Sequence, residues 1–358
     1  MKSNANIRIV DIAEMANVSI GTVDRVLHNR GHVSEEKRER VEKVLKEINY
    51  EPNMVARFLA SKRNYIFAAI VPFYNKGSYW ELACEGINRA AKEMRKFNIT
   101  VEYFQFDQYD RNSFTLATES LLGSKFDGVV IPTLFGEYVI ELSGKLDELN
   151  IPYIYIDSGL SGQNNLAYFG GDSFVSGSIA AKLLLMETGS NADIIFSHIK
   201  FKHKEVSIQM RTREAGFMDY LSKIGYTGTI HHVEINPDNL AQGKKQLEEI
   251  LKKTNSVLGG IVFNSRIYEL IKVLEKIDSK LKENLRLIGH DAIEGNITAL
   301  KKGQIMFLLS QRPDLQGYDA VKALGNYLLF KQIPDKENFM PIDILIRENI
   351  DYYKNYKL

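Results

Sequence analysis

The sequence predicts a small N-terminal all-α domain followed by an α/β body of two lobes, each built on a doubly wound parallel sheet. Three observations lead to this prediction. Apolar residues in the first fifty positions recur at helical spacing, strand-like and helix-like stretches alternate from Tyr65 onward, and the strand-like runs form two series. Alternating strands and helices are typical of parallel sheets covered by helices, and two series indicate two lobes with a cleft between them.

The composition fits a globular chain longer than one typical domain. Its 358 residues are 44% hydrophobic, which supplies ample core material. No apolar run reaches the roughly 18 residues of a membrane span, and the N-terminus lacks a charged-then-apolar export signal. The single cysteine, Cys84, excludes an internal disulfide framework and is interpreted as a buried thiol. We therefore expect a soluble, cytoplasmic protein with no membrane partner.

Residues 10–29 predict two short helices joined by a tight turn. The first helical run breaks at Asn17, and Ser19 can then cap a second helix beginning at Ile20, because its side-chain oxygen can accept a free backbone N–H. The second helix is expected to bury Val23, Val26 and Leu27. A helix–turn–helix places its second helix in the major groove of DNA, with the N-terminal residues toward the base edges. The pattern therefore indicates DNA binding.

The sequence that follows makes this interpretation specific. Ser34 is expected to cap a third helix, Glu35–Ile48, with acidic residues in its first turn. In the motifs VDIAEMANVS, TVDRVLHNR, VSEEKRERV and INYEPNMVARFLASKR, the chain resembles the lac-repressor family of bacterial transcriptional regulators. The resemblance covers essentially the whole chain. It implies a headpiece at 1–52, a hinge helix or linker at 53–63, and a body similar to periplasmic sugar-binding proteins.

The resemblance implies a set of DNA-binding residues in the headpiece. They are Ser19, Ile20, Gly21, Thr22, Arg25 and His32. The fork of Arg25 can pair with guanine or phosphate, although an ordinary surface arginine is the alternative. Gly21 and Asp24 depart from the commonest family pattern, so the operator sequence does not transfer from a relative.

The hinge segment is the second part of the predicted DNA-binding device. It is too short to form a stable helix alone in water. In the family, two copies become helical over the operator centre, and a leucine wedges into the minor groove and kinks the DNA. Leu59 matches that leucine, Ala56 is small enough for two helices to approach, and Asn53 begins the segment. A plain linker or packing role for Leu59 is the alternative.

The distribution of charge predicts a dimer. Residues 1–63 carry 12 Lys and Arg against 9 Asp and Glu, whereas the rest carries 34 against 36. A headpiece of net charge +3 is only modestly basic, so strong binding to double-stranded DNA needs two headpieces acting together. The last residues show no heptad repeat, which favours a homodimer over the tetramers that some family members form.

The body carries polar and aromatic residues where its strands end. Ligands of open parallel sheets bind outside the carboxyl ends of the strands. The residues that we single out there are Phe73, Tyr79, Trp80, Asp107, Thr133, Asp157, Arg213, Asn264, Asp291 and Gln311. Aromatic rings cover the apolar face of a sugar, and fixed Asp, Asn and Arg groups satisfy its hydroxyls. We therefore expect a sugar or sugar derivative as the effector.

The resemblance adds weight at particular positions. Arg213, Asn264 and Asp291 match ligand-contacting positions of the family, and Gln311 is expected near a lobe crossover. Alternatives remain open for several residues. Asp157 and Asp291 could cap helices or turns. Arg213 is expected to begin a helix and could be a surface ion-pair partner. Tyr79 and Trp80 could be core residues at a helix start.

The resemblance also implies the path of the chain. Crossings near residues 160, 292 and 325 would make the N-terminal lobe 64–160 plus 292–325, and the C-terminal lobe 161–291 plus 326–358. The final strand, Ile342–Arg347, would then return to the second lobe.

Other classes of protein fit the sequence less well. It contains no phosphate-binding loop, HExxH or GxSxG motif, its histidines lack zinc-ligand spacing, and no cofactor or metal is expected. Hence we do not expect an enzyme. The alternatives to a ligand-controlled repressor are a transcriptional activator using the same cleft and a small-molecule binding protein. The DNA-binding headpiece argues against the latter.

Overall fold

The computed structural model describes residues 8–27, 31–48, 50, 63–200, 207–253 and 256–353. The chain divides into two compact units, Met1–Lys62 and Arg63–Leu358, and each is described by itself. The predicted hinge residues Asn53, Ala56 and Leu59 lie outside the described residues.

The described residues of the N-terminal unit form three helices, α1 (Ile9–Ala16), α2 (Ile20–Leu27) and α3 (Glu35–Glu47). Its core residues are Ile12, Ala13, Ala16, Val23, Val26 and Val41. Asn17 ends α1 in the left-handed conformation, with φ of 50°, which Asn adopts more readily than most residues. Ser34 is the N-cap residue of α3, but its side chain makes no cap hydrogen bond. The predicted position of the cap is therefore confirmed, and the Ser34 carbonyl oxygen accepts the N–H groups of Lys37 and Arg38.

The prediction of two largely parallel sheets is confirmed, and among the described residues of the body each sheet has six strands in the same order. The first sheet has the order β2-β1-β3-β4-β5-β11 and the second β7-β6-β8-β9-β10-β12. The strands of the first are β1 (Tyr65–Pro72), β2 (Ile99–Phe106), β3 (Gly128–Pro132), β4 (Tyr153–Asp157), β5 (Ala167–Gly170) and β11 (Glu337–Phe339). The strands of the second are β6 (Ile194–Ile199), β7 (Ile230–Ile235), β8 (Leu258–Ile261), β9 (Leu285–His290), β10 (Phe307–Ser310) and β12 (Asp343–Leu345). All neighbours are parallel except β10 and β12.

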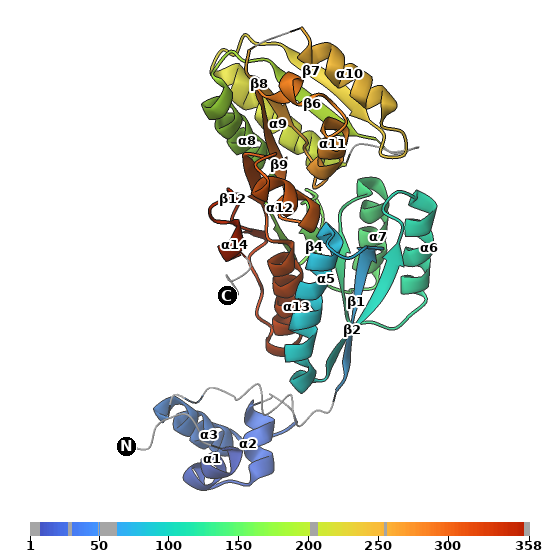
Figure 1. Ribbon diagram of the computed structural model, residues 1–358. Helices are drawn as coiled ribbons and strands as arrows, with labels where there is room; N and C mark the ends of the chain where they lie inside the picture. The colour runs from blue at the N-terminus through green and yellow to red at the C-terminus, as the bar shows by residue number, and fades with distance from the viewer. Residues whose placement is uncertain are drawn as a thin grey trace. The chain divides into compact units, whose positions relative to one another are not determined.

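Helices cover both faces of each sheet. In the first lobe these are α5 (Tyr79–Met94), α6 (Arg111–Leu122), α7 (Gly136–Glu148) and α13 (Pro313–Phe330), with a short 3-10 turn at Arg95–Phe97. In the second they are α8 (Ser173–Thr188), α9 (Ile208–Lys223), α10 (Ala241–Leu251), α11 (Ile267–Leu274), α12 (Glu294–Lys301) and α14 (Ile350–Tyr353), with a 3-10 turn at Ser279–Lys282. The pairs α5–α13 and α8–α9 lie side by side (Figure 1). The first pair touches closely, because a Cβ on Gly86 would lie 1.8 Å from the Asp314 carbonyl oxygen.

The chain crosses between the lobes at positions other than those predicted. β5 pairs with β4, so the chain stays in the first lobe until about residue 170 rather than 160. β10 pairs with β9 and keeps it in the second lobe until 310 rather than 292. β11 pairs with β5, so the last crossing follows Phe339 rather than 325. The predicted boundaries are wrong because strands of only three or four residues extend both sheets, β5 and β11 the first and β10 the second.

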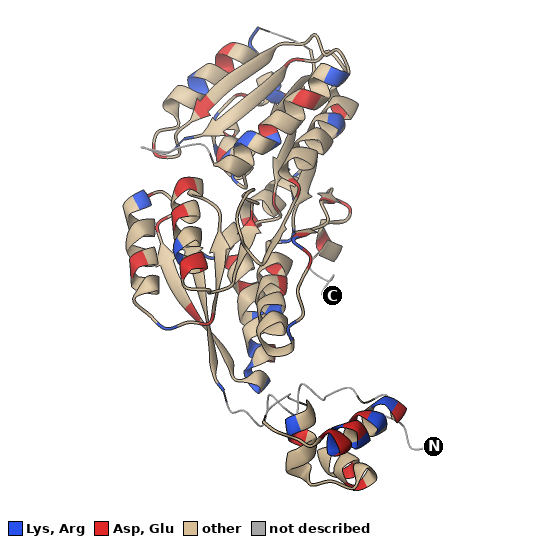
Figure 2. Cartoon of the chain, turned by 180° about the vertical axis from the view of Figure 1, so that it is seen from behind, with Lys and Arg blue, Asp and Glu red and all other residues tan. Residues whose placement is uncertain are grey.

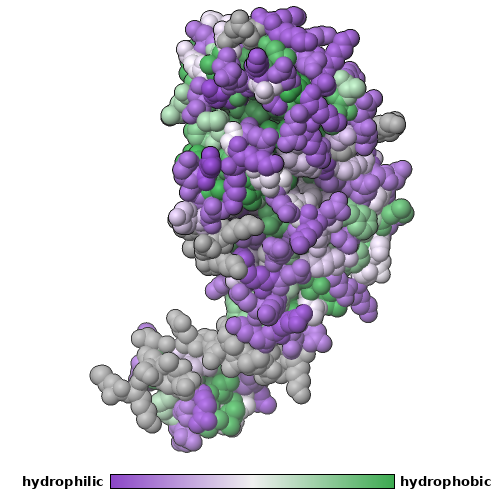
Figure 3. All heavy atoms as spheres, in the orientation of Figure 1, coloured by the Kyte–Doolittle hydropathy of each residue, from purple (hydrophilic) through white to green (hydrophobic). Residues whose placement is uncertain are grey.

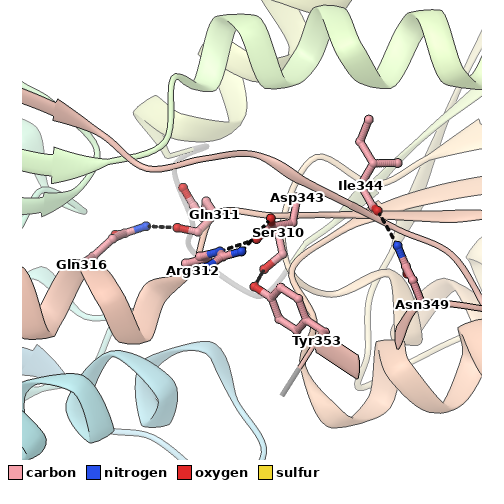
Figure 4. A network of polar contacts seen from close by, with 8 residues as sticks. All are labelled: Ser310, Gln311, Arg312, Gln316, Asp343, Ile344, Asn349 and Tyr353. Atoms are coloured by element: carbon pink, nitrogen blue, oxygen red, sulfur yellow. Dashed lines mark hydrogen bonds and ion pairs between the residues drawn. The ribbon is translucent and has the colours of Figure 1, made fainter. Parts of the chain in front are cut away.

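A polar network ties two of these crossings together (Figure 4). Arg312, in the connection between β10 and α13, forms a bidentate pair with Asp343, with nitrogen–oxygen distances of 2.5 and 2.9 Å. The neighbouring Ser310 hydroxyl lies 2.7 Å from the Tyr353 hydroxyl. The return of the chain to the second lobe is therefore fixed against the β10–α13 crossing.

The surface carries both signs of charge. Lys and Arg alternate with Asp and Glu along α3 (Figure 2). The face of the body drawn in Figure 3 is largely hydrophilic, and hydrophobic residues lie in small areas between hydrophilic ones. None of the helices within the described ranges combines the length and apolar content needed to cross a lipid bilayer.

Candidate functional sites

The first candidate site is the exposed start of α2 in the N-terminal unit. The Ser19 side-chain oxygen accepts the Thr22 N–H at 3.2 Å, which confirms the predicted helix cap. Ile20 is 52% exposed although it is apolar, and Gly21 and Arg25 are also exposed. A Cβ on Gly21 would meet no atom closer than 4.0 Å, so packing does not require glycine. An exposed helix start of this kind suits contact with DNA.

The remaining residues of the headpiece prediction differ in their surroundings. His32 is exposed and precedes α3. Thr22 is half-buried, and its hydroxyl lies 2.9 Å from that of Ser19. Contact of these side chains with DNA stays a prediction.

The second candidate site is a cleft of about 1440 Å³ between the two lobes of the body. Six of the residues predicted from the sequence line it: Phe73, Tyr79, Trp80, Asp157, Asn264 and Asp291. Trp80 is 6% exposed and Tyr79 8%, and their rings pack edge to face at 5.0 Å. Both residues therefore belong to the core at the start of α5 and to the wall of the cleft.

The other four predicted residues do not line this cleft. Asp107 is exposed, and one carboxylate oxygen accepts the Tyr109 N–H at 2.9 Å in a local turn. Thr133 is buried and donates its hydroxyl to the Ser158 carbonyl oxygen at 2.7 Å. Arg213 and Gln311 are buried behind the wall. The prediction that Arg213 begins a helix is wrong, because α9 begins five residues earlier, at Ile208.

Asp157 is the centre of a buried hydrogen-bond network that joins the lobes. One of its carboxylate oxygens accepts the Tyr79 hydroxyl at 2.7 Å and the Gln209 amide at 2.8 Å. Gln209 belongs to α9 of the second lobe, so this bond crosses the cleft. Gln311 donates to the Tyr79 hydroxyl at 3.1 Å. Burial raises the pKa of Asp157 above its ordinary value despite these donors.

Asp291 has unused hydrogen-bonding capacity at the equivalent position of the second lobe. It is 2% exposed, and its Oδ1 has no hydrogen-bond partner among the described residues. Burial raises its pKa to about 6. A buried acceptor without a partner costs free energy, and a ligand hydroxyl could satisfy it.

Arg213 and His290 complete the polar cluster beside the two aspartates. Arg213 Nη1 donates to the Phe263 carbonyl oxygen at 2.9 Å, while its Nε has no partner among the described residues. Burial holds the pKa of His290 well below its ordinary value, so the ring is neutral. Its Nδ1 lies 3.1 Å from the Val262 carbonyl oxygen and must carry the proton there, which leaves Nε2 as an acceptor. The two carboxylates line the cleft and can accept ligand hydroxyl groups, whereas Arg213 and His290 are buried beside them and do not line it.

Tyr109, Gln209 and Arg266 are among the cleft residues that sequence reasoning missed. A signal for Gln209 was present, because Ser207 accepts the Met210 N–H as the N-cap of α9. Recognising that cap would have placed Gln209 one turn before Arg213 on the same face of the helix. No comparable signal marks Tyr109 or Arg266, whose proximity depends on how the lobes meet.

The fold and the two sites define a class of protein, a DNA-binding regulator with a two-lobed ligand-binding body. Residues 8–53 match the family of bacterial regulatory proteins of the lacI type, and residues 67–332 match the periplasmic binding protein domain. The chain belongs to the lacI family and is a DNA-binding transcriptional regulator.

Relatives and solved structures agree with this membership. The ribose operon repressor of Halalkalibacterium halodurans is 24% identical, and the match covers 95% of this chain and 96% of the relative. Catabolite control protein A of Staphylococcus epidermidis is 29% identical, with coverage of 97% and 98%. A crystal structure assigned to the LacI transcriptional regulators, from Bacteroides fragilis, has a TM-score of 0.75 and 33% identity. It covers 81% of this chain and all of that one.

Proposed function

We propose that this regulator acts as a homodimer on a pseudopalindromic operator and is controlled by a sugar or sugar derivative bound between its lobes. The observation that carries the proposal is the pair of buried carboxylates in the cleft lining, Asp157 and Asp291, with Arg213 buried beside them; Asp291 Oδ1 lacks a partner among the described residues. Hydroxyl groups donate to carboxylates and accept from guanidinium groups, which makes a polyhydroxylated ligand the best match. The name of one relative, the ribose operon repressor, supports the same ligand class.

DNA binding is assigned to the exposed start of α2, with Arg25 as the main contact. A modest headpiece charge supports paired headpieces, and a pseudopalindromic site matches a protein with two-fold symmetry. We further propose that Leu59 wedges into the minor groove. Leu59→Ala would then weaken specific operator binding more than nonspecific binding, and equal losses on both would contradict the wedge.

Effector control is proposed to shift the balance between two lobe arrangements. Such a shift requires the ligand to prefer one of them. Coupling of roughly 1–3 kcal/mol would change operator affinity about 5- to 150-fold.

A thermal-shift titration with D-ribose, other pentoses, hexoses and their phosphates tests the ligand class. A compound that binds the folded state raises the melting temperature by mass action. We expect at least one sugar to stabilise the wild type and to have a reduced effect on Asp291→Asn. If no sugar changes the melting temperature while operator DNA does, the sugar proposal fails and the proposal of DNA regulation stands.

A further inference from the structure

Two of the strand-end residues form matching turns on opposite sides of the cleft. Asp107 Oδ1 accepts the N–H of Tyr109, two residues later, at 2.9 Å. Asn264 Oδ1 accepts the N–H of Arg266, also two residues later, at 2.9 Å. Each is a turn in which a short polar side chain bonds the backbone just ahead of it. Asp107 and Asn264 therefore determine the direction of Tyr109 and Arg266.

The two residues held by these turns meet across the cleft. Tyr109 lies between β2 and α6 in the first lobe, and Arg266 lies between β8 and α11 in the second. The Arg266 guanidinium carbon lies 5.1 Å from the centre of the Tyr109 ring, within the range of a cation–π interaction. Both residues are half-buried and line the cleft. Burial also lowers the pKa of Arg266, and a desolvated guanidinium gains more from an aromatic face than a hydrated one.

The base of Arg266 is held firmly by buried side chains. His290 contacts the Val262 carbonyl oxygen and Arg213 the Phe263 carbonyl oxygen. Asn296 donates to the Ser265 carbonyl oxygen at 3.0 Å. Three anchors of this kind, on Val262, Phe263 and Ser265, fix the segment from which the Arg266 side chain projects toward Tyr109.

We propose that Tyr109 and Arg266 form a gate across the cleft, and that Asp107 and Asn264 are positioning residues for this gate rather than ligand contacts. The lobes also touch through the Gln209–Asp157 bond and through the Glu294 N–H, 3.3 Å from the Gly77 carbonyl oxygen. Of these three contacts, Tyr109–Arg266 is the one between two side chains that project from loops. Its role in admitting an effector rests on the proposed function, whereas the gate itself is testable without a sugar.

Trp80 provides the measurement, because it is the only tryptophan in the chain and it lines the cleft. Acrylamide quenching of its fluorescence in the full-length protein reports access to the cleft. A cation–π pair contributes a roughly 2- to 30-fold bias at equilibrium. We therefore expect Arg266→Ala to raise the quenching constant at least about twofold and Tyr109→Phe, which keeps the ring, to leave it unchanged. Tyr109→Leu tests the same contact from the first lobe if Arg266→Ala does not fold.

Arg89→Ala is the matched control. The Arg89 guanidinium lies 4.7 Å from the centre of the Tyr318 ring, in a pair between α5 and α13 away from the cleft lining. Quenching should not change in this variant. The gate is refuted if folded Arg266→Ala and Tyr109→Leu have the same quenching constant as the wild type. It is also refuted if Arg89→Ala raises the quenching constant as much as they do.

The positioning role has its own test. Asp107→Ala and Asn264→Ala should raise quenching as Arg266→Ala does, whereas Asp107→Asn keeps a turn-forming oxygen and should not. Unchanged quenching in both alanine variants would overturn the positioning role. Because no sugar enters any of these measurements, failure of the sugar proposal cannot be mistaken for failure of the gate.

Discussion

Asp157 and Asp291 occupy equivalent positions in the two sheets and share an unusual backbone conformation. Asp157 ends β4, which lies between β3 and β5 in the first sheet. Asp291 follows β9, which lies between β8 and β10 in the second sheet. Both have positive φ, 75° and 66°, where residues other than Gly, Asn and Asp are strained. The left-handed turn puts a carboxylate from each lobe into the cleft wall. One is occupied by Tyr79 and Gln209, and the other keeps an oxygen for a ligand.

Asp291→Asn should stabilise the ligand-free protein at neutral pH. The folded-state pKa of about 6 exceeds the ordinary value of 3.8, so the folded state retains a proton that the unfolded state has lost. The contribution of Asp291 to stability is present below pH 3.8 and is lost as pH rises through about 6. This difference corresponds to about 3 kcal/mol.

Urea unfolding of both proteins between pH 4 and pH 8 measures this effect. The free-energy difference between wild type and Asp291→Asn should grow as pH rises and level off above pH 7. A difference that does not depend on pH would contradict the buried, partly protonated carboxyl. Asparagine also tolerates positive φ, so this variant avoids the backbone strain that Asp291→Ala would add.

Tyr79→Phe should destabilise the body by about 1–3 kcal/mol, because it removes a buried donor from the Asp157 carboxylate and an acceptor from Gln311. The loss should be larger at pH 8 than at pH 5, since an ionised Asp157 needs the donor more. Tyr103→Phe is the control, because the Tyr103 hydroxyl bonds the exposed Asn88 at 2.8 Å. Equal losses in the two variants would mean that the buried network adds nothing.

Arg25→Ala should weaken operator binding roughly 5- to 150-fold without changing the unfolding of the body. The exposed side chain leaves from α2, the helix expected in the major groove. Lys46→Ala in the last turn of α3 removes the same charge from the headpiece. Fluorescence anisotropy on operator and random DNA should show a much smaller effect for Lys46→Ala. Similar losses of operator affinity in Arg25→Ala and Lys46→Ala would mean that Arg25 contributes only its positive charge.

Gly86→Ala and Gly144→Ala should change stability in opposite directions. A methyl group on Gly86 would lie 1.8 Å from the Asp314 carbonyl oxygen, which forces α5 and α13 apart, and overpacking of this kind costs about 1–3 kcal/mol. Gly144, within α7, has nothing within 4 Å of its Cβ position, so alanine should stabilise the helix by up to about 1 kcal/mol. Thermal unfolding measures both, and stabilisation by Gly86→Ala would refute the close helix contact.

The parts of the fold that were predictable are those determined by local sequence. The Ser19 cap, the apolar spacing of the headpiece and the long strands of the body each depend on neighbouring residues, and each has its counterpart in the structure. Asp157 and Asp291 were also identified, since a polar residue at the end of a buried strand is a local pattern.

The errors have a common physical cause in contacts between distant segments. β5 and β11 are too short to show a pattern of their own, and pairing with one another and with β4 makes them strands. For Asp107 and Asn264 the sequence gives the position at a strand end but not the partner of the side chain, and their role as ligand contacts stays a prediction. That partner is the backbone two residues ahead.

The sequence by itself determined a helix–turn–helix unit, a body of two parallel sheets and the residues that end their strands, because caps and apolar periodicity act within a few residues. Only the tertiary structure decided where the chain changes lobe, that Gln209 bonds Asp157 across the cleft, and that Arg266 stacks on Tyr109. These contacts join residues of different lobes, and their formation depends on how two separately folded sheets pack together.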